Sequence, residues 1–430
     1  MTTTKNNEHK KLNFSSEREQ SQVCLNSAEH EKNQGRKVLN VPNLRFPEFQ
    51  GEWEEHLLGN ISDVTKLAGF EFTKYVTYED TGSIIAIRGL NCKNGSLDLR
   101  DVKYIDNSDF SKLSRSKLYV GDILYTYVGT VGEVAVVDKN DKYYLAPNVS
   151  RIRLSKDYNS DFIKQLLGSK KFYNKIVFPL IATSSQPALS MENLRRFKLR
   201  VPSIKEQNKI ASLFNAIDER IATQNKIIED LKRLKSAIIE KEYSNKTKNF
   251  SRLGDFIEQI SKRNKDRAIH NVLSVSNSQG FIQQSEQFEN RIVASDDTSN
   301  YKIVERNHFA FNPARINVGS IARLITFEKG IVSPMYICFR TKDSLFPEYL
   351  GYYFESKQFF IEIQKRLEGS VRQCLSFEGL CNIPLSIPMV EVQQQIGKRL
   401  SALVQKIKLE TDFLELLQKQ KKFLLQQMFI

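Results

Sequence analysis

The sequence contains one segment twice, and this repeat limits the folds open to the chain. Residues 185–242 align with residues 371–428 at a constant offset of 186. Pro202 falls on Pro388, and VPSIKEQNKI falls on IPMVEVQQQI. Repeats of this length indicate that one structural unit was duplicated. We therefore expect two similar halves, and a protein that does one job at two places.

Each copy continues into a stretch that predicts one long helix. The stretches span about residues 203–243 and 389–430, contain no proline, and have Gly397 as their one glycine. About 40 residues at about 1.5 Å each give a rod of about 60 Å. Apolar residues recur in alternating steps of four and three, the spacing of a coiled-coil seam. The predicted seam residues are Ile210, Phe214, Ile217, Ile221, Ile228, Leu231, Ile238, Ile396, Leu400, Leu403, Ile407, Leu414, Leu417 and Leu424.

Both seams are interrupted at matching positions. Gln224 falls on Glu410, and Lys235 falls on Lys421. Polar residues in a seam lower its stability but fix its register. We therefore predict that the two helices pair as an antiparallel coiled coil with internal pseudo-two-fold symmetry. The alternative is two independent helices, each lying on its own domain.

A globular domain precedes each helix. Strand patterns at 83–90, 121–129 and 132–138 are followed by an amphipathic stretch at 161–178 that predicts a helix. The same order returns in the second half, where residues 346–367 predict the matching helix. The fold class is therefore α+β. The predicted divisions are a mobile extension (1–41), a first domain (42–200), a first helical spacer (201–246), a second domain (247–386) and a second helical spacer (387–430).

Composition narrows the class of protein. Hydrophobic residues make up 40% of the chain, which is ordinary for a globular protein. No apolar run approaches the ~18 residues of a membrane span, and the first residues lack the apolar core of a signal peptide. We therefore expect a cytoplasmic protein. The five cysteines lack zinc or redox spacing, which indicates reduced thiols.

The net charge of +14 favours a polyanionic partner, most often nucleic acid. The basic excess is spread mildly over every segment, so any basic surface must be assembled by the fold. Motifs for chemistry are missing: the sequence has no G-x-x-x-x-G-K-[ST] loop, and its five histidines have no metal-binding spacing. We expect no catalytic residue, no metal site and no cofactor bound by this chain.

Three segments carry a resemblance to a known family. They are PNLRFPEFQGEWEEHLLGNI (42–61), SMENLRRFKLRVPSIKEQNKIASLFNAID (190–218) and its second copy SFEGLCNIPLSIPMVEVQQQIGKRLSALV (376–404). With two diverged domains and two matched helices, the chain resembles the specificity subunit of type I restriction–modification systems over residues 42–430. Two departures are the long N-terminal extension and Val392, which stands where the first copy has Glu206.

The resemblance implies a role without enzymatic activity. Each domain would be a target recognition domain that reads one half of an asymmetric, bipartite site in double-stranded DNA, and the coiled coil would set the spacer. Two methyltransferase (modification) subunits, which carry S-adenosylmethionine, would dock on the repeated regions. Two restriction/translocase subunits, which use ATP and Mg, would complete the enzyme.

Loops that follow predicted strands supply the candidate base readers. Arginine suits guanine, asparagine or glutamine suits adenine, and serine or threonine suits either. The candidates in the first domain are Arg88, Asn91, Lys93, Asn94, Thr183, Ser184, Ser185 and Gln186. Those in the second are Ser276, Asn277, Gln279, Arg315, Asn317, Arg372 and Gln373. Gln186 and Gln373 align within one residue and are the leading pair; for each candidate, a solvated loop or a phosphate contact is the alternative.

Three other functions are weighed against this one. A stand-alone DNA-binding protein such as a repressor would bind tightly without partners. A coiled-coil adaptor without a DNA role explains the helices but not two domains rich in loop Arg, Asn and Gln. A nuclease would need a cluster of metal ligands, which the sequence lacks.

Overall fold

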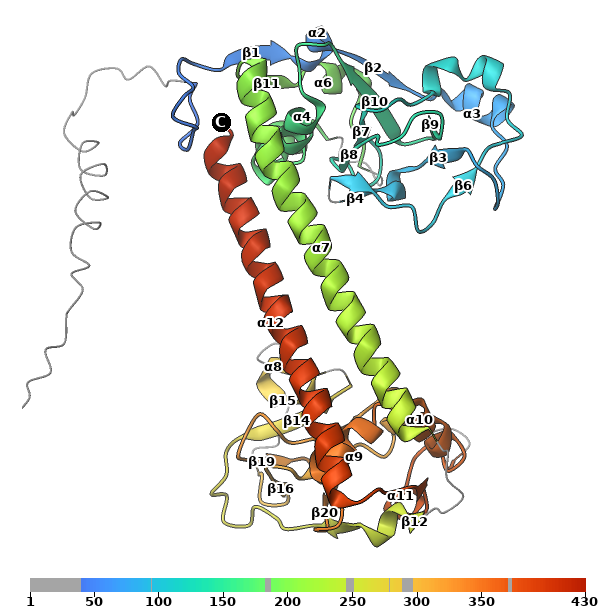
Figure 1. Ribbon diagram of the computed structural model, residues 1–430, viewed down its shortest axis with the longest axis vertical. Coiled ribbons are helices and arrows are strands. Elements are labelled where there is room, and N and C mark those ends of the chain that lie inside the picture. Colours follow the sequence, from blue (N-terminus) through green and yellow to red (C-terminus); the bar gives the residue numbers. More distant parts are fainter. Residues whose placement is uncertain are drawn as a thin grey trace, which may run out of the picture. The chain divides into compact units, whose positions relative to one another are not determined.

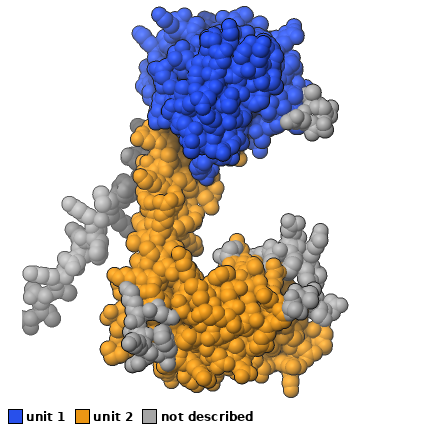
Figure 2. Space-filling view, turned by 90° about the vertical axis from the view of Figure 1, so that its right-hand side faces the viewer, with its two compact units in different colours: residues 1–212, 423–430 blue, residues 213–422 orange. Residues whose placement is uncertain are grey.

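The computed structural model describes residues 40–93, 95–181, 187–244, 251–277, 279–287, 297–369 and 373–430. All but the last two residues of the predicted extension (1–41) lie outside these ranges. The chain divides into two compact units (Figure 2), one of residues 1–212 and 423–430 and the other of residues 213–422. The last residues of the chain therefore belong to the first unit.

The first domain has two central sheets. One is antiparallel, in the order β2 (Ser62–Lys66), β10 (Val149–Leu154), β7 (Ile123–Thr126), β8 (Val134–Val136). The other has the order β6 (Lys103–Tyr104), β3 (Ile85–Ile87), β9 (Tyr143–Leu145), and its β3 and β9 run parallel. Two short antiparallel pairs are β1 (Glu54–Leu57) with β11 (Lys198–Val201), and β4 (Cys92–Lys93) with β5 (Ser96–Leu97). The helices are α2 (Leu58–Ile61), α3 (Gly69–Tyr75), α4 (Ser160–Leu167), α5 (Lys170–Phe172) and α6 (Met191–Arg195).

The second domain repeats this plan. Its antiparallel sheet has the order β13 (Ile257–Ile260), β20 (Ile337–Thr341), β17 (Phe309–Phe311), β18 (Ile321–Arg323). Its second sheet has the order β15 (Gly280–Gln283), β14 (Val272–Ser276), β19 (Lys329–Val332), β16 (Lys302–Glu305), and here too one pair, β14 and β19, is parallel. Strand β12 (Ser251–Arg252) pairs with β21 (Pro384–Leu385). The helices are α8 (Gln284–Gln287), α9 (Pro347–Tyr353), α10 (Lys357–Gln364) and α11 (Phe377–Cys381).

Residues 58–60 (LGN) in the first domain and residues 253–255 (LGD) in the second pack in the same way. A Cβ on Gly59 would lie 3.0 Å from the Cβ of Arg195, and one on Gly254 would lie 2.7 Å from the Cβ of Cys381. Arg195 and Cys381 are 186 residues apart, so they are equivalent positions of the repeat. Glycine is needed at both places because the backbone passes directly against α6 or α11. The prediction of two similar α+β domains is confirmed.

The helices predicted at 161–178 and 346–367 are each split in two, so those single-helix predictions were wrong. The break follows from a serine that starts a new helix in each domain. The hydroxyl of Ser169 accepts a hydrogen bond from the Phe172 N–H at 3.2 Å, and that of Ser356 accepts one from the Phe359 N–H at 3.2 Å. A serine that caps a new helix ends the amphipathic run before it.

The long helices are α7 (Ile204–Tyr243) and α12 (Val390–Met428). They run side by side in opposite directions (Figure 1), and contacts within the second unit fix this arrangement. The Arg220 guanidinium lies 5.4 Å from the centre of the Phe413 ring, and Asp218 pairs with Lys421. Residue numbers fall along α12 as they rise along α7, so the predicted antiparallel coiled coil is confirmed and the two helices are not independent.

One of the two matched interruptions, Gln224 with Glu410, forms a contact at the middle of the paired helices. The Gln224 side-chain amide donates to the Glu410 carbonyl at 3.0 Å and also bonds the Glu410 carboxylate. These residues are equivalent by the offset of 186, and in a two-fold pair equivalent residues meet only on the symmetry axis. The Gln224–Glu410 contact therefore marks the local two-fold axis of α7 and α12. Each predicted seam residue is buried or half-buried.

Candidate nucleic-acid interface

Strand order brings four loops together in the first domain. Strands β3 and β9 are parallel, so they end at the same edge, and β9 leads directly into β10, which lies antiparallel to β7. The loops that follow β3, β7 and β9 therefore converge there, joined by the loop before α6. We call them loop cluster 1 and define it as residues 88–93, 127–133, 146–148 and 187–189.

Backbone hydrogen bonds hold loop cluster 1 together. The Tyr127 N–H donates to the Asn148 carbonyl at 3.0 Å, the Gly129 N–H donates to the Pro187 carbonyl at 2.9 Å, and the Leu189 N–H donates to the Tyr127 carbonyl at 2.8 Å. The cluster borders a hollow of about 660 Å³. Its polar lining residues include Tyr78, Arg88, Lys93, Thr130, Glu133 and Asn148.

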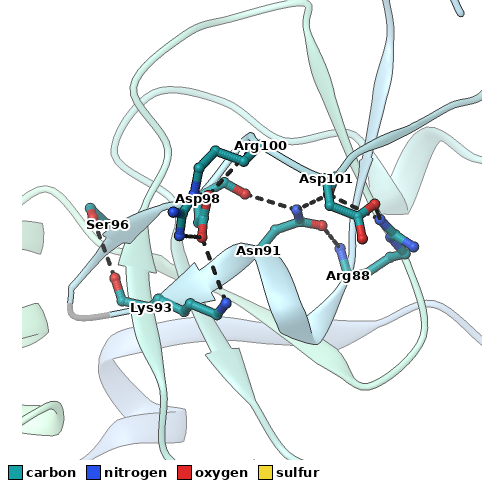
Figure 3. A network of polar contacts seen from close by, with 7 residues as sticks. All are labelled: Arg88, Asn91, Lys93, Ser96, Asp98, Arg100 and Asp101. Atoms are coloured by element: carbon teal, nitrogen blue, oxygen red, sulfur yellow. Dashed lines mark hydrogen bonds and ion pairs between the residues drawn. The ribbon is translucent and has the colours of Figure 1, made fainter. Parts of the chain in front are cut away.

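The loop after β3 is fixed by its own polar network, drawn in Figure 3. Asn91 is 0% exposed; its side-chain oxygen accepts from the Arg88 N–H at 3.0 Å, and its NH₂ donates to the carbonyls of Asp98 and Asp101 at 2.9 and 2.7 Å. These bonds use both amide donors, so the Asn91 side chain shapes the loop in this structure. The base contact proposed for Asn91 stays a prediction.

Arg88 and Lys93, the two cations of that loop, differ in how available they are to bind a phosphate. Arg88 donates from Nη2 to the Asp101 carboxylate at 2.7 Å, while its buried Nε has no hydrogen-bond partner within the described part of the chain. Lys93 is exposed, and its ammonium lies 3.6 Å from the Asp98 carboxylate. A hydrogen bond from Arg100 holds the pKa of Asp98 well below its usual range, so this carboxylate stays charged. Lys93 is thus the more available of the two cations for a phosphate.

Asn148 was missed by the sequence reasoning. Its side chain is exposed in the hollow, and its backbone has a φ of 73°, in the left-handed region that few residues other than glycine adopt. Asparagine tolerates this conformation, and strained residues of this kind gather at functional sites. The signal in the sequence is only a Pro-Asn pair between two strands.

The second domain assembles the equivalent loops. We call them loop cluster 2: residues 276–280 without 278, residues 312–320, residues 333–335 and residues 373–375. The Leu375 N–H donates to the Pro313 carbonyl at 3.1 Å, the Asn312 amide lies 3.8 Å from the sulfur of Met335, and the Ser320 hydroxyl donates to the Val275 carbonyl at 3.4 Å. These contacts tie three of the loops to one another and to β14, and the fourth loop follows directly from β14.

Loop cluster 2 gathers every second-domain candidate that the structure describes. Asn277, Gln279, Arg315 and Gln373 are exposed, and Ser276 and Asn317 are half-buried. Asn94, Thr183, Ser184, Ser185, Gln186 and Arg372 lie outside the described residues. The base contacts proposed for all of these residues stay predictions. The exposed apolar side chains of Val318 and Met335 were not predicted.

The two junctions between domain and helix share two equivalent side-chain hydrogen bonds. Gln207 and Gln393 are both buried; each donates to the carbonyl of the preceding proline, Pro202 or Pro388, at 2.8 Å. The side-chain oxygen of Gln207 accepts from the Asn159 N–H at 3.0 Å, and that of Gln393 accepts from the Phe346 N–H at 2.7 Å. One buried amide thus clamps each domain to the start of its helix.

The first junction has one addition. Glu206 is 1% exposed and receives two hydrogen bonds from Arg45, at 2.8 and 2.7 Å. The hydrogen bond to Glu206 raises the pKa of Arg45. The second copy has Val392 in place of Glu206, where it packs at the edge of an apolar core. The departure noted from the sequence therefore reflects a partner, Arg45, that comes from the start of the first domain, ahead of β1.

The helix ends pack in equivalent ways. In the first unit, the Phe429 ring lies 5.2 Å from Phe162 and 6.2 Å from Trp53. In the second unit, the Tyr243 ring lies 4.8 Å from Tyr349. Phe429 and Tyr243 are 186 residues apart, so the repeat extends to the aromatic anchor of each helix end.

Within the described ranges, no group of three or more His, Cys, Asp or Glu side chains could hold a metal ion. Among the same residues, no helix is long and apolar enough to cross a membrane.

A family model decides the identity of these repeated domains. The model described as type I restriction modification DNA specificity domain matches the chain twice, at residues 50–233 and 244–419. The chain belongs to this family. Specificity subunits of this family are not catalytic, and the two matches cover both domains and most of both long helices.

Individual relatives agree over different lengths. A specificity subunit assigned to the MjaX type I restriction enzyme of Methanocaldococcus jannaschii is 21% identical over 425 residues, covering 90% of this chain and 95% of that one. The EcoKI specificity subunit of Escherichia coli is 24% identical over 168 residues, 36% of each chain. The solved type I S subunit of M. genitalium has a TM-score of 0.58 at 15% identity, covering 91% of this chain and 99% of that one. The last similarity is one of fold.

Proposed function

We propose that this specificity subunit reads a bipartite DNA site, with loop cluster 1 on one half-site and loop cluster 2 on the other. The observation that carries the proposal is the contrast between matched junctions and unmatched loops. Gln207 and Gln393 repeat the same bonds, whereas Asn148 and Met335 occupy one position with opposite chemistry. Equivalent frames with different reading surfaces suit a site whose halves differ.

The paired helices would set the spacer between the half-sites. Half-sites one turn of DNA apart lie about 34 Å from centre to centre, and α7 and α12, at about 1.5 Å per residue, are long enough to span that distance. The polar pair at Gln224 and Glu410 supports this role because a polar contact in an apolar seam penalises slippage.

A deletion of equal length in both long helices tests whether their length sets the spacer. Removing residues 221–227 and 407–413 takes one facing heptad from each helix, including the Gln224–Glu410 pair, and shortens the pair by about 10 Å, or about three base pairs at about 3.4 Å each. The exposed Ile227 and Leu409 are removed as well, so co-purification of the methyltransferase is measured first, to show that docking survives on the remaining exposed Leu234 and Leu416. We expect the methylome of a host carrying this variant to show a spacer about three base pairs shorter, with both half-sites unchanged. A methylome that changes in its half-sites, or keeps its spacer, would contradict this role.

The first experiment compares host methylomes with and without the gene. Loss of one asymmetric, bipartite N6-methyladenine motif would support the reader role and give both half-sites together. An unchanged methylome, combined with a chain that still captures a methyltransferase, would favour an adaptor without a DNA role.

Partner subunits would supply the chemistry. In this proposal two methyltransferase subunits bring S-adenosylmethionine, two restriction/translocase subunits bring ATP and Mg, and the chain itself binds no cofactor. The complex would act on DNA in the cytoplasm.

Exposed apolar stripes on the long helices support docking there. Ile227 and Leu234 on α7, and Leu409 and Leu416 on α12, are exposed, and the members of each pair are seven residues apart. That spacing keeps each pair on one stripe of a coiled-coil helix. Leu409→Glu with Leu416→Glu should abolish co-purification of the methyltransferase without moving the urea midpoint. The matched control, Gln405→Glu, changes an exposed polar position of the same helix and should leave co-purification intact.

A further inference from the structure

The two loop clusters can be compared at two pairs of aligned positions. Pro147–Asn148 falls on Pro334–Met335 at an offset of 187, and Val131–Gly132 falls on Val318–Gly319 at the same offset. Gly132 and Gly319 both have a positive φ, of 101° and 89°, so the backbones turn alike. The side chains beside them can therefore be compared directly.

The same two positions differ in what they expose. Val131 is 9% exposed in loop cluster 1, whereas Val318 is 53% exposed in loop cluster 2. The exposed Asn148 is matched by Met335, which is 59% exposed. Loop cluster 2 thus presents two apolar side chains where loop cluster 1 presents one polar side chain and a buried valine.

The surroundings of Met335 favour DNA over a protein partner. The loops of cluster 2 contain Arg315 and no aspartate or glutamate, so their charge suits a polyanion. The Asn312 amide lies 3.8 Å from the Met335 sulfur, which ties this apolar side chain to the loop that carries Arg315 and Val318. Polar candidates on the same cluster, Gln279 and Gln373, are exposed beside these loops.

We propose that the second domain reads a thymine through its 5-methyl group, with Met335 and Val318 as the contacting side chains. The inference rests on the proposed function. Among the four unmodified DNA bases, thymine alone carries a methyl group in the major groove, and apolar side chains recognise it there. Methionine suits the task because its flexible thioether adapts to a small apolar group. Asn148, at the matching position of the first domain, is suited to the N6 and N7 edge of adenine instead.

Uracil tests this contact because it is thymine without the methyl group. The probe is a duplex bearing the site found in the methylome, with each thymine replaced by uracil in turn, and the protein is the full chain with its methyltransferase subunits. We expect uracil at one position of one half-site to weaken binding about fourfold, the value of one buried methyl group. Met335→Ala should bring the thymine-to-uracil affinity ratio at that position close to one. Val318→Ala should lower the ratio partly.

The matched control is Asn148→Ala, which should weaken binding at the other half-site and leave the uracil effect in place. The proposal is overturned if no thymine responds to uracil, if the responding half-site keeps its full response in Met335→Ala, or if Met335→Ala releases the methyltransferase without changing base preference. A wild-type complex that binds no DNA sequence specifically would instead overturn the proposed function, and the inference with it.

Discussion

The junctions and the loop clusters come from the same duplication, yet only the junctions have kept their contacts. At the junctions, Gln207 and Gln393 bond equivalent groups at equivalent distances. In the loop clusters, the polar Asn148 aligns with the apolar Met335, and the buried Val131 aligns with the exposed Val318. A buried amide that bonds backbone has few replacements, because any other residue leaves polar groups unsatisfied. An exposed loop residue has many.

This difference separates the residues that position the domains from the residues proposed to contact DNA. The junction residues have two constraints, because each must fit both its own domain and the helix that follows. The parts that contact a ligand are constrained by that ligand alone. Arg45 with Glu206 is a buried ion pair at the first junction, and the second junction has Val392 in place of Glu206. It is therefore the first place to break the comparison.

Arg45→Ala should have the largest effect on stability. It leaves the Glu206 carboxylate buried without its cation, and breaking such a pair costs about 3–5 kcal/mol. Urea denaturation of the full chain measures the loss. The double variant Arg45→Met with Glu206→Val restores the residue of the second copy and should cost about 1 kcal/mol or less. Equal losses in the single and double variants would contradict the role given to this pair.

Gln393→Ala and Gln207→Ala should come next, at about 2–3 kcal/mol each, because each leaves buried backbone groups unpaired. Gln393 should cost more, since it also donates to the Ser344 carbonyl at 3.0 Å. Gln395→Ala changes an exposed position of the same helix and is the control for urea denaturation. Losses no larger than that of the control would argue against a clamp.

Substitutions in one loop cluster should affect one half-site. Arg372→Ala with Gln373→Ala should cost about 1–3 kcal/mol of discrimination at a single base, the range of one good base contact. Methylome sequencing of the variant gives the new consensus. Equal relaxation of both half-sites would mean that the change harms folding or docking, and would remove these residues from the readers.

Gln224→Leu with Glu410→Leu should have the smallest effect on free energy. Replacing a polar pair in a seam by apolar residues is often neutral or stabilising, but it removes the contact that fixes register. We expect methylated sites with more than one spacer length. A single unchanged spacer would place the register elsewhere, with Asp218 and Lys421 as the next pair to change.

The sequence predicts the junctions and the long helices well because both are present in two aligned copies. Two aligned copies locate the prolines, the seams and the polar pair, and each copy supports the other. The helices end at Tyr243 and Met428, and the same pattern predicts ends at about 243 and 430. The split of the shorter helices at Ser169 and Ser356 is missed because an amphipathic pattern continues across the cap.

The sequence predicts the reading loops only as loops. It places Arg88, Gln279 and Arg315 after strands, and the structure brings their loops into the two clusters. It cannot tell that Asn91 is buried by its own turn, since an asparagine after a strand looks the same whether it bonds backbone or faces solvent. The exposed Val318 and the buried Val131 are identical residues at aligned positions, and only the packing around them differs.

The last eight residues of the sequence complete the first domain, and this has a consequence for synthesis. Trp53 and Phe162 are synthesised before the second domain, but Phe429, which packs on both, is synthesised after it. The first domain therefore waits with an uncovered aromatic surface while the whole second domain is translated. A stop codon between the second domain and Phe429 would leave the first domain without this packing.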